Sequence, residues 1–160
     1  MSNEPRIPLS PAEQGFAWMN DPHFVLVSGA PRPVAPYSHA VESAGFVFLT
    51  GQLPNDPEDD DRPFPEGIEA QTRRVMENLR IVLEGMGSGL EDIVSVRVFL
   101  SSFDRDYAKM NGVYRSFFPV DRLPARTCIG VTALARQGLV EIDAIARRPD
   151  RSQSLPGDGQ

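Results

Sequence analysis

The sequence contains only one cysteine, Cys128, and only two histidines, His23 and His39. A single cysteine cannot form an internal disulfide, and the two histidines have no Asp or Glu at metal-ligand spacing. We therefore expect neither a disulfide-stabilised protein nor a metal site. Residues 1–14 lack the charged start and apolar run of a secretory signal, so we expect a reducing, cytoplasmic location.

The sequence also lacks a basic cluster and any long apolar run. It carries 16 Lys and Arg against 22 Asp and Glu, a formal net charge of -6, and the basic residues are scattered. A nucleic-acid binder presents a dense basic face, so this composition argues against nucleic acid as a partner. Every hydrophobic run ends within about eight residues, whereas a membrane-spanning helix needs roughly 18, so we expect no membrane insertion.

The apolar residues that are present, 41% of 160, suffice for one buried core, but the chain is too short for two ordinary domains. We predict one domain over residues 24–149. Residues 1–23 are polar and rich in proline, which predicts an N-terminal arm, in which PAEQGFAWM could form a short helix anchored by Trp18. Residues 150–160 have the Pro, Gly, Ser and Gln bias of a disordered C-terminal tail.

Within this domain, the residue patterns predict three strands, a helix, a strand, a helix and two strands. The first three strands are the aromatic and β-branched runs FVLVSG, YSHAVES and FVFLTGQ. Helical spacing of apolar residues follows from Ile68 to Met86 and again over residues 104–118, and Gly85 or Gly87 is expected to end the first helix. IVSVRVFL lies between the helices with Val94, Val96, Val98 and Leu100 predicted on one face; ARTCIGVT and LVEIDAIA come last. The segment NDPEDDDRPFP is typical of a solvated loop.

This element order favours the α+β class, with a single mixed sheet and both helices on one face. Such a two-layer arrangement leaves the other sheet face bare. Apolar residues on a bare face must be covered, and a second copy of the chain is the simplest cover. We therefore expect the protein to form an oligomer.

Arg126 lies inside the apolar run LPARTCIGV. A buried guanidinium cannot become neutral by losing its proton, so its charge needs an anion as a partner. One interpretation is a salt bridge to Glu141 or Asp143. The other is a bidentate clamp for the carboxylate of a substrate, which suits the planar fork of arginine.

Glu141 and Asp143 occupy alternate positions of LVEIDAIA and therefore share one sheet face. They form either interface ion pairs or an exposed strand face, or they supply a general acid or base that positions water. In a simple hairpin of the last two strands, Arg126 and Glu141 would lie about 13 Å apart. Either these strands are not hairpin neighbours, or a second subunit completes a pocket that contains both residues.

Cys128 shares the face of Arg126. With no histidine placed to activate it, it is interpreted as a small apolar residue rather than a nucleophile. Thr50 and Gly51 lie at a strand end, where a glycine would let a ligand approach the backbone. A β-bulge is the alternative explanation for that glycine.

Over residues 31–149 the chain resembles the RidA/YjgF family of reactive-intermediate deaminases. The resemblance rests on APYSHAV, FVFLTGQLP, QTRRVMENL followed by LEDIVSVRVFL, FDRDYAKMNGVYRSFF, PARTCIGV and VEIDAIA, in that order and spacing. It implies a chorismate-mutase-like α+β fold assembled as a homotrimer, with clefts at the subunit interfaces. It also implies that no metal or organic cofactor is needed.

By the same resemblance, Arg126 is expected to hold the carboxylate of a 2-imino acid and Glu141 to position the attacking water. Tyr37, Thr50 and Gly51 are expected to line the cleft. The backbone of Cys128 is expected to help place the imine nitrogen.

The implied reaction is that of a 2-iminobutanoate/2-iminopropanoate deaminase, which releases a 2-keto acid and ammonia. The chain departs from the family at His39, where Gln is usual, and at Thr50, where Ser is usual. The alternative function is a non-catalytic trimer that binds metabolites, RNA or a protein, with Arg126 as an interface ion pair.

Overall fold

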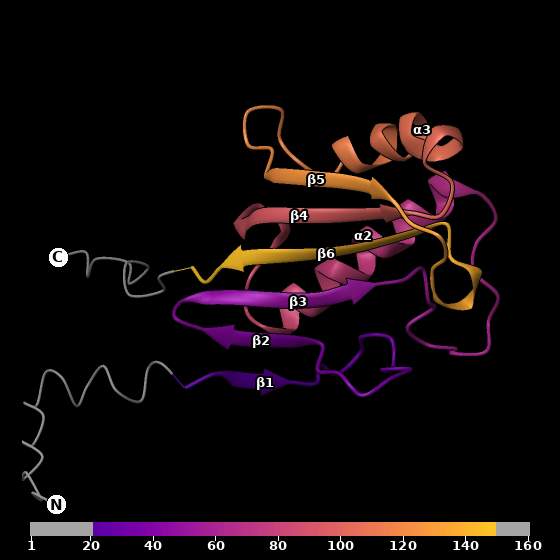
Figure 1. The fold of residues 1–160 in the computed structure, drawn as a ribbon. Helices are drawn as coiled ribbons and strands as arrows, with labels where there is room; N and C mark the ends of the chain where they lie inside the picture. The colour runs from indigo at the N-terminus through magenta and orange to yellow at the C-terminus, as the bar shows by residue number, and fades with distance from the viewer. Residues whose placement is uncertain (1–20, 150–160) are drawn as a thin grey trace, which may run out of the picture.

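The computed structural model describes residues 21–149, so the predicted N-terminal helix, Trp18 and the C-terminal tail lie outside the described residues. Within this range the chain forms one six-stranded mixed sheet with two helices packed on one of its faces (Figure 1). The predicted α+β class is confirmed. The elements are β1 (His23–Val25), β2 (Ala40–Ser43), β3 (Phe46–Gln52), α2 (Ile68–Gly85), β4 (Ile93–Leu100), α3 (Phe103–Arg115), β5 (Ala125–Gly130) and β6 (Val140–Arg147), with short 3-10 turns at Leu90–Asp92 and Ala135–Gln137.

The strand order across the sheet is β1-β2-β3-β6-β4-β5. β4 and β5 are parallel and are joined by α3, whereas the other neighbours are antiparallel. β6 inserts between β3 and β4, so β4 separates the last two strands of the chain. The first of the two alternatives for Arg126 and Glu141 is therefore confirmed: the last two strands are not hairpin neighbours.

The core lies between the sheet and the helices. β6 contributes the four alternate residues Val140, Ile142, Ala144 and Ala146, none more than 2% exposed. α2 buries the set that the helical spacing predicts: Ile68, Thr72, Val75, Leu79 and Val82, with Met86 following at its cap. Neither helix within residues 21–149 has both the length and the hydropathy to cross a bilayer.

β4 differs from its predicted pattern at one residue. Val96, Val98 and Leu100 are buried as predicted, but Val94 is 43% exposed. The register of β4 against β6 shifts between Ile93 and Ser95, which is the signature of a bulge. The extra residue turns Val94 away from the core and places Ile93 there instead.

α2 ends at Gly85, and two glycines serve two purposes at this end. Gly87 adopts φ +72°, a left-handed conformation that costs glycine little. Gly85 is needed for close packing, because a Cβ at this position would lie 2.3 Å from Cγ1 of Val27. The loop after β1 is thereby packed directly against the end of α2.

We expect Gly85→Ala to lower the free energy of unfolding by about 1–3 kcal/mol, because the added methyl group overlaps the buried Val27 side chain. Gly112→Ala is the matched control. Gly112 lies in α3 with nothing within 4 Å of an added Cβ, so this change should instead stabilise by roughly 0.5–1 kcal/mol through helix propensity. Urea unfolding of both variants at one protein concentration tests the difference; equal effects would contradict the packing argument.

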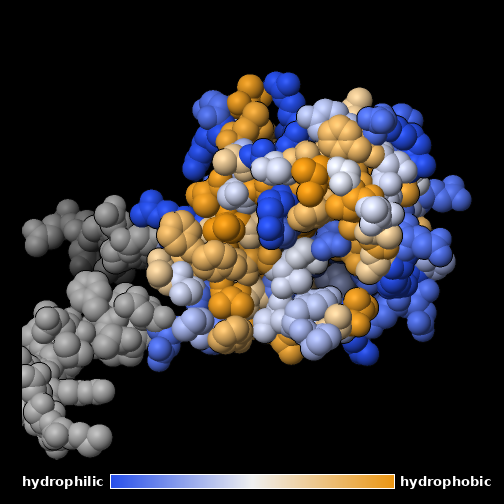
Figure 2. All heavy atoms as spheres, viewed as in Figure 1, coloured by the Kyte–Doolittle hydropathy of each residue, from blue (hydrophilic) through white to orange (hydrophobic). Residues whose placement is uncertain are grey.

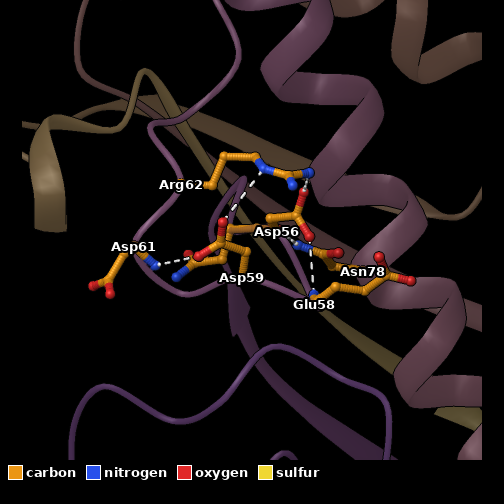
Figure 3. Close-up of polar contacts among 7 residues, drawn as sticks. Asp56, Glu58, Asp59, Asp61, Arg62 and Asn78 are labelled. Carbon is orange, nitrogen blue, oxygen red and sulfur yellow. Dashed lines mark hydrogen bonds and ion pairs between the residues drawn. The ribbon is translucent and has the colours of Figure 1, made fainter.

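The acidic segment after β3 is organised around Arg62 (Figure 3). The guanidinium of Arg62 lies 2.5 Å from Oδ2 of Asp56 and 3.7 Å from Oδ2 of Asp59. Asp56 also accepts the backbone N–H of Glu58 at 2.9 Å, and this bond lowers the pKa of its carboxyl. Asn78 of α2 donates to two backbone carbonyls at the start of the loop, both at 2.9 Å. The middle of the loop is exposed, as predicted, but Asn55 at its start is buried, and internal contacts hold the shape of the loop.

The sheet face opposite the helices carries exposed aromatic and aliphatic side chains. Figure 2 shows this face, with hydrophobic residues gathered over the strands and polar residues among them. Phe46 and Phe48 alternate with buried residues of β3 and are 40% and 43% exposed, and register places Phe24 and Ile129 on the same face, 67% and 46% exposed. A patch of this kind is typical of a surface that binds another protein.

Candidate active site

Arg126 lies on β5, an edge strand of the sheet. It pairs with Val96 of the parallel neighbour β4, so its side chain points toward the helix layer. There its Nη1 donates to Oδ1 of Asn111 at 2.7 Å, and its Cζ lies 4.7 Å from the ring centre of Tyr114. Asn111 and Tyr114 are three residues apart on α3, so one helix face supplies both contacts.

Among residues 21–149, the Arg126 side chain makes no ion pair, and Asn111 is its one hydrogen-bond acceptor. Asp143 instead binds Arg97, with Nε donating to Oδ1 at 3.0 Å. The salt bridge from Arg126 to Glu141 or Asp143 is therefore absent from the described chain. A guanidinium has five N–H donors, so Arg126 keeps donors available for an anion.

The Arg126 side chain borders an open groove of about 440 Å³. Apolar atoms of Leu123 and Pro124 form part of the wall, and the cation lies beside them. A groove with one cation and apolar walls suits a small organic acid. Its lining consists of Asn111, Tyr114, Arg115, Leu123, Pro124 and Arg126.

The two ionisable side chains beside Arg126 remain neutral at ordinary pH. Burial raises the pKa of Tyr114 to about 12, although the charge of Arg126 opposes the shift. Burial also raises the pKa of the Cys128 thiol against the same opposing charge. Neither group is therefore an anion that could neutralise Arg126, and Cys128 has the protonated thiol expected of a structural cysteine.

A second cluster of predicted site residues forms around Gly51. The register of β3 against β6 shifts between Leu49 and Gln52, so the β-bulge considered as the alternative explanation for Gly51 is present. A Cβ on Gly51 would lie 2.1 Å from Oε1 of Glu141, so this carboxylate lies directly against the glycine backbone. Tyr37 lines a small pocket together with Gly51.

Thr50 lies in the same bulge, but its hydroxyl already donates a hydrogen bond within the protein. The Oγ1 of Thr50 donates to the Ser38 carbonyl at 2.6 Å, and its N–H donates to the His39 carbonyl at 3.1 Å. Thr50 therefore ties the bulge to the segment that carries Tyr37. The hydroxyl proton is not available to a ligand in this arrangement.

The surroundings of Glu141 make it a stronger base than an ordinary glutamate. Burial raises the pKa of its carboxyl, and the nearby negative charge of Asp143 raises it further. A carboxylate with a raised pKa accepts a proton from water more readily at neutral pH. No three His, Cys, Asp or Glu side chains of the described residues gather where a metal ion could bind.

The described chain does not bring Arg126 and Glu141 together. Arg126 faces the helices, whereas Glu141 alternates with buried residues of β6 and faces the opposite side of the sheet. Two strand spacings and three residues along the strands separate their Cα atoms, about 14 Å in all. The predicted site residues therefore form two groups: Arg126 with Cys128, and Tyr37, Thr50 and Gly51 with Glu141.

Asn111 and Tyr114 were not predicted as site residues. The helical spacing places both on the packed side of α3, which is the ordinary position of core residues. One indication was present in the sequence: Asn111 is a polar residue within that apolar face, and a polar group in such a position requires a hydrogen-bond partner. Its partner, Arg126, could not be identified before β5 was placed beside α3.

A protein-family model described as Endoribonuclease L-PSP matches residues 27–148. The chain belongs to this family. It corresponds to the RidA/YjgF family that the motifs resemble, and the match covers almost all of the described domain.

Curated relatives align over the same region. A RutC family protein of Pyrococcus horikoshii is 39% identical over 76% of this chain and 94% of its own. The 3-aminoacrylate deaminase RutC of Acinetobacter baylyi is 36% identical, with coverage of 76% and 94%. The 2-iminobutanoate/2-iminopropanoate deaminase of Salmonella typhimurium is 33% identical, with coverage of 78% and 96%. Family members with deaminase names thus match this domain along nearly their whole length.

Solved structures of the family share the fold. RidA from an Antarctic Psychrobacter species superposes with a TM-score of 0.73 and is 34% identical, covering 78% of this chain and 98% of its own. TdcF of E. coli, crystallised with bound serine, has a TM-score of 0.72 and 30% identity, with coverage of 79% and 99%. The two-layer arrangement of this chain is therefore the family arrangement.

Proposed function

We propose that the protein is a hydrolytic deaminase that converts 2-imino acids and their enamine tautomers to 2-keto acids and ammonia. The observation that carries this proposal is Arg126, a guanidinium without a carboxylate partner in the described chain, at the wall of an open groove. The carboxylate of 2-iminobutanoate or 2-iminopropanoate would supply the missing anion through paired charge-assisted hydrogen bonds. The relatives named as deaminases act on substrates of this class.

In the proposed mechanism, Arg126 holds the carboxylate and thereby fixes the imine carbon next to the attacking water. Glu141 accepts a proton from the water as its oxygen bonds to that carbon. Glu141 then returns this proton to the nitrogen, which completes the carbinolamine. A second proton passes from the carbinolamine hydroxyl to the nitrogen as the C–N bond breaks, so ammonia leaves and the keto group forms. The backbone at Cys128 is proposed to orient the nitrogen. Orientation and charge pairing are sufficient for this chemistry, because the imine carbon is already electrophilic.

Arg126 and Glu141 lie on opposite sides of the sheet, so the mechanism requires a second copy of the chain. We propose a homotrimer in which the Arg126 groove of one copy meets the Tyr37, Gly51 and Glu141 group of its neighbour. The apolar face with Phe46 and Phe48 supports such an assembly, since this surface would be buried between copies.

The experiment that tests the proposal generates 2-iminopropanoate or 2-iminobutanoate in situ with an amino-acid oxidase and follows its hydrolysis. We expect the protein to accelerate release of ammonia and 2-keto acid above the spontaneous rate, and to have the mass of three chains in light scattering. An intact assembly that leaves the spontaneous rate unchanged would refute the deaminase.

A non-catalytic metabolite-binding trimer is the alternative, and one observation favours it. TdcF was crystallised with serine, a carboxylate ligand that has no imine to hydrolyse. In that case, calorimetry would detect binding of serine or 2-oxobutanoate without turnover of the imine. The description of the family as endoribonuclease names RNA as a further ligand, but the net charge of -6 and the lack of a basic face argue against it here.

A further inference from the structure

His39 is 3% exposed, and both of its ring nitrogens are engaged. The backbone N–H of Val27 donates to Nδ1 at 2.8 Å, and Nε2 lies 2.9 Å from the carbonyl oxygen of Pro31. A carbonyl oxygen can only accept, so Nε2 carries the proton, whereas Nδ1 must be unprotonated to accept the Val27 N–H. These two partners hold the ring in a single neutral tautomer.

The segment that His39 holds is residues 26–37, called here the strap, which connects β1 to β2. The strap contains Pro31, Pro33 and Pro36 and has no helix or strand along its length. The ring of His39 is hydrogen-bonded to the backbone of the strap at Val27 and Pro31. At its other end, the hydroxyl of Tyr37 accepts the N–H of Val34 at 3.3 Å, so the aromatic wall of the proposed site belongs to the same strap.

His39 also connects the strap to the bulge of β3. Its backbone carbonyl accepts the N–H of Thr50 at 3.1 Å. Its ring lines the same small pocket as Tyr37 and Gly51. One buried residue therefore sets the position of the strap relative to the Gly51 backbone and the adjacent Glu141.

We propose that His39 is a positioning residue, which holds the strap and Tyr37 against Gly51 through the hydrogen bonds of both ring nitrogens. This inference rests on the proposed deaminase function. A side chain without an acceptor at this position would leave the Val27 N–H without a partner and free the strap to move away from Gly51.

The charged groups near His39 do not bind its ring. Arg32 and Tyr37 line the same pocket, and Arg32 is paired with Asp60 at 3.7 Å. Glu141 lies against Gly51, and Glu84 is exposed at the end of α2, where Val27 packs. None of the carboxylates in residues 21–149 forms an ion pair with His39.

The matched test variants are His39→Leu and His39→Gln. A glutamine amide offers one acceptor and one donor, so it can keep both hydrogen bonds, whereas leucine keeps neither. We expect His39→Leu to lower kcat/KM by about tenfold, mainly through a higher KM, and His39→Gln to restore it to within about twofold of the wild type. Equal kcat/KM for the wild type and His39→Leu would overturn the positioning role.

A second readout does not depend on activity. Amide hydrogen exchange at Val27, compared among the wild type, His39→Gln and His39→Leu at one pH, reports whether the N–H is still bonded. We expect exchange in His39→Leu to be faster than in the wild type and in His39→Gln; equal exchange in all three proteins would overturn the inference. If none of the three proteins deaminates, the proposed function fails, and the exchange measurement alone decides the role of His39.

Discussion

Replacing Arg126 by alanine is expected to lower kcat/KM for 2-imino acids by about 10³-fold, because two charge-assisted hydrogen bonds to the substrate carboxylate are lost. Steady-state rates with imine generated in situ measure this loss. The assembly should persist, since in the described chain the hydrogen bond and the cation–π contact of this side chain are both made with α3 of the same chain.

Arg126→Lys and Arg73→Ala serve as controls for this prediction. Lysine keeps the charge but loses the planar fork, so we expect a smaller loss of about 10–100-fold. Arg73 is an exposed residue of α2, and its removal changes the net charge equally but should leave the rate near that of the wild type. Disassembly of Arg126→Ala would instead favour the interface ion pair of the non-catalytic alternative.

Gly51→Ala is expected to lower kcat/KM by about 10²-fold, because the new methyl group would lie where Oε1 of Glu141 now is and would displace the carboxylate from the water it positions. Gly51 does not have a positive φ. The backbone can therefore accept alanine, and the effect should concern the site rather than the fold. Thermal unfolding of the variant checks that the fold is retained.

A double-mutant cycle isolates the cause of this loss. If Gly51→Ala acts by moving the carboxylate, it should add little to the loss caused by Glu141→Gln, because the group that it displaces is already disabled. Purely additive losses of kcat/KM would show that the two residues act independently, and the contact between them would then have no effect on catalysis.

Local patterns predicted most elements well, but β1 ends at Val25, so most of the predicted strand FVLVSG is not a strand, and the pairing of strands was not predicted. The helical spacing of α2 and the strand β4 follow from neighbouring residues, so Ile68 and Leu100 were placed correctly. The position of β6 between β3 and β4 depends on contacts between distant segments, and no local pattern contains it. The bulge that turns Val94 outward likewise depends on the register with β6.

The candidate site, too, could be predicted from the sequence only in part. Arg126 and Glu141 could be identified from the sequence because a charged side chain on an otherwise apolar strand is costly to bury unless it has a partner or a function. That they face opposite sides of the sheet could not be predicted, because it depends on β4 lying between β5 and β6. The roles of Asn111 and His39 depend on partners 15 and 12 residues away, which only the folded chain brings together.

The central claim is that Arg126 is left free by the protein to bind a small organic acid. A crystal structure of the assembled protein with 2-oxobutanoate, the proposed product, tests it most directly. We expect a carboxylate bound to the Arg126 guanidinium, with Glu141 of a neighbouring copy beside the keto carbon. An Arg126 that is ion-paired across the interface with a carboxylate of the protein, with no ligand in the groove, would contradict it.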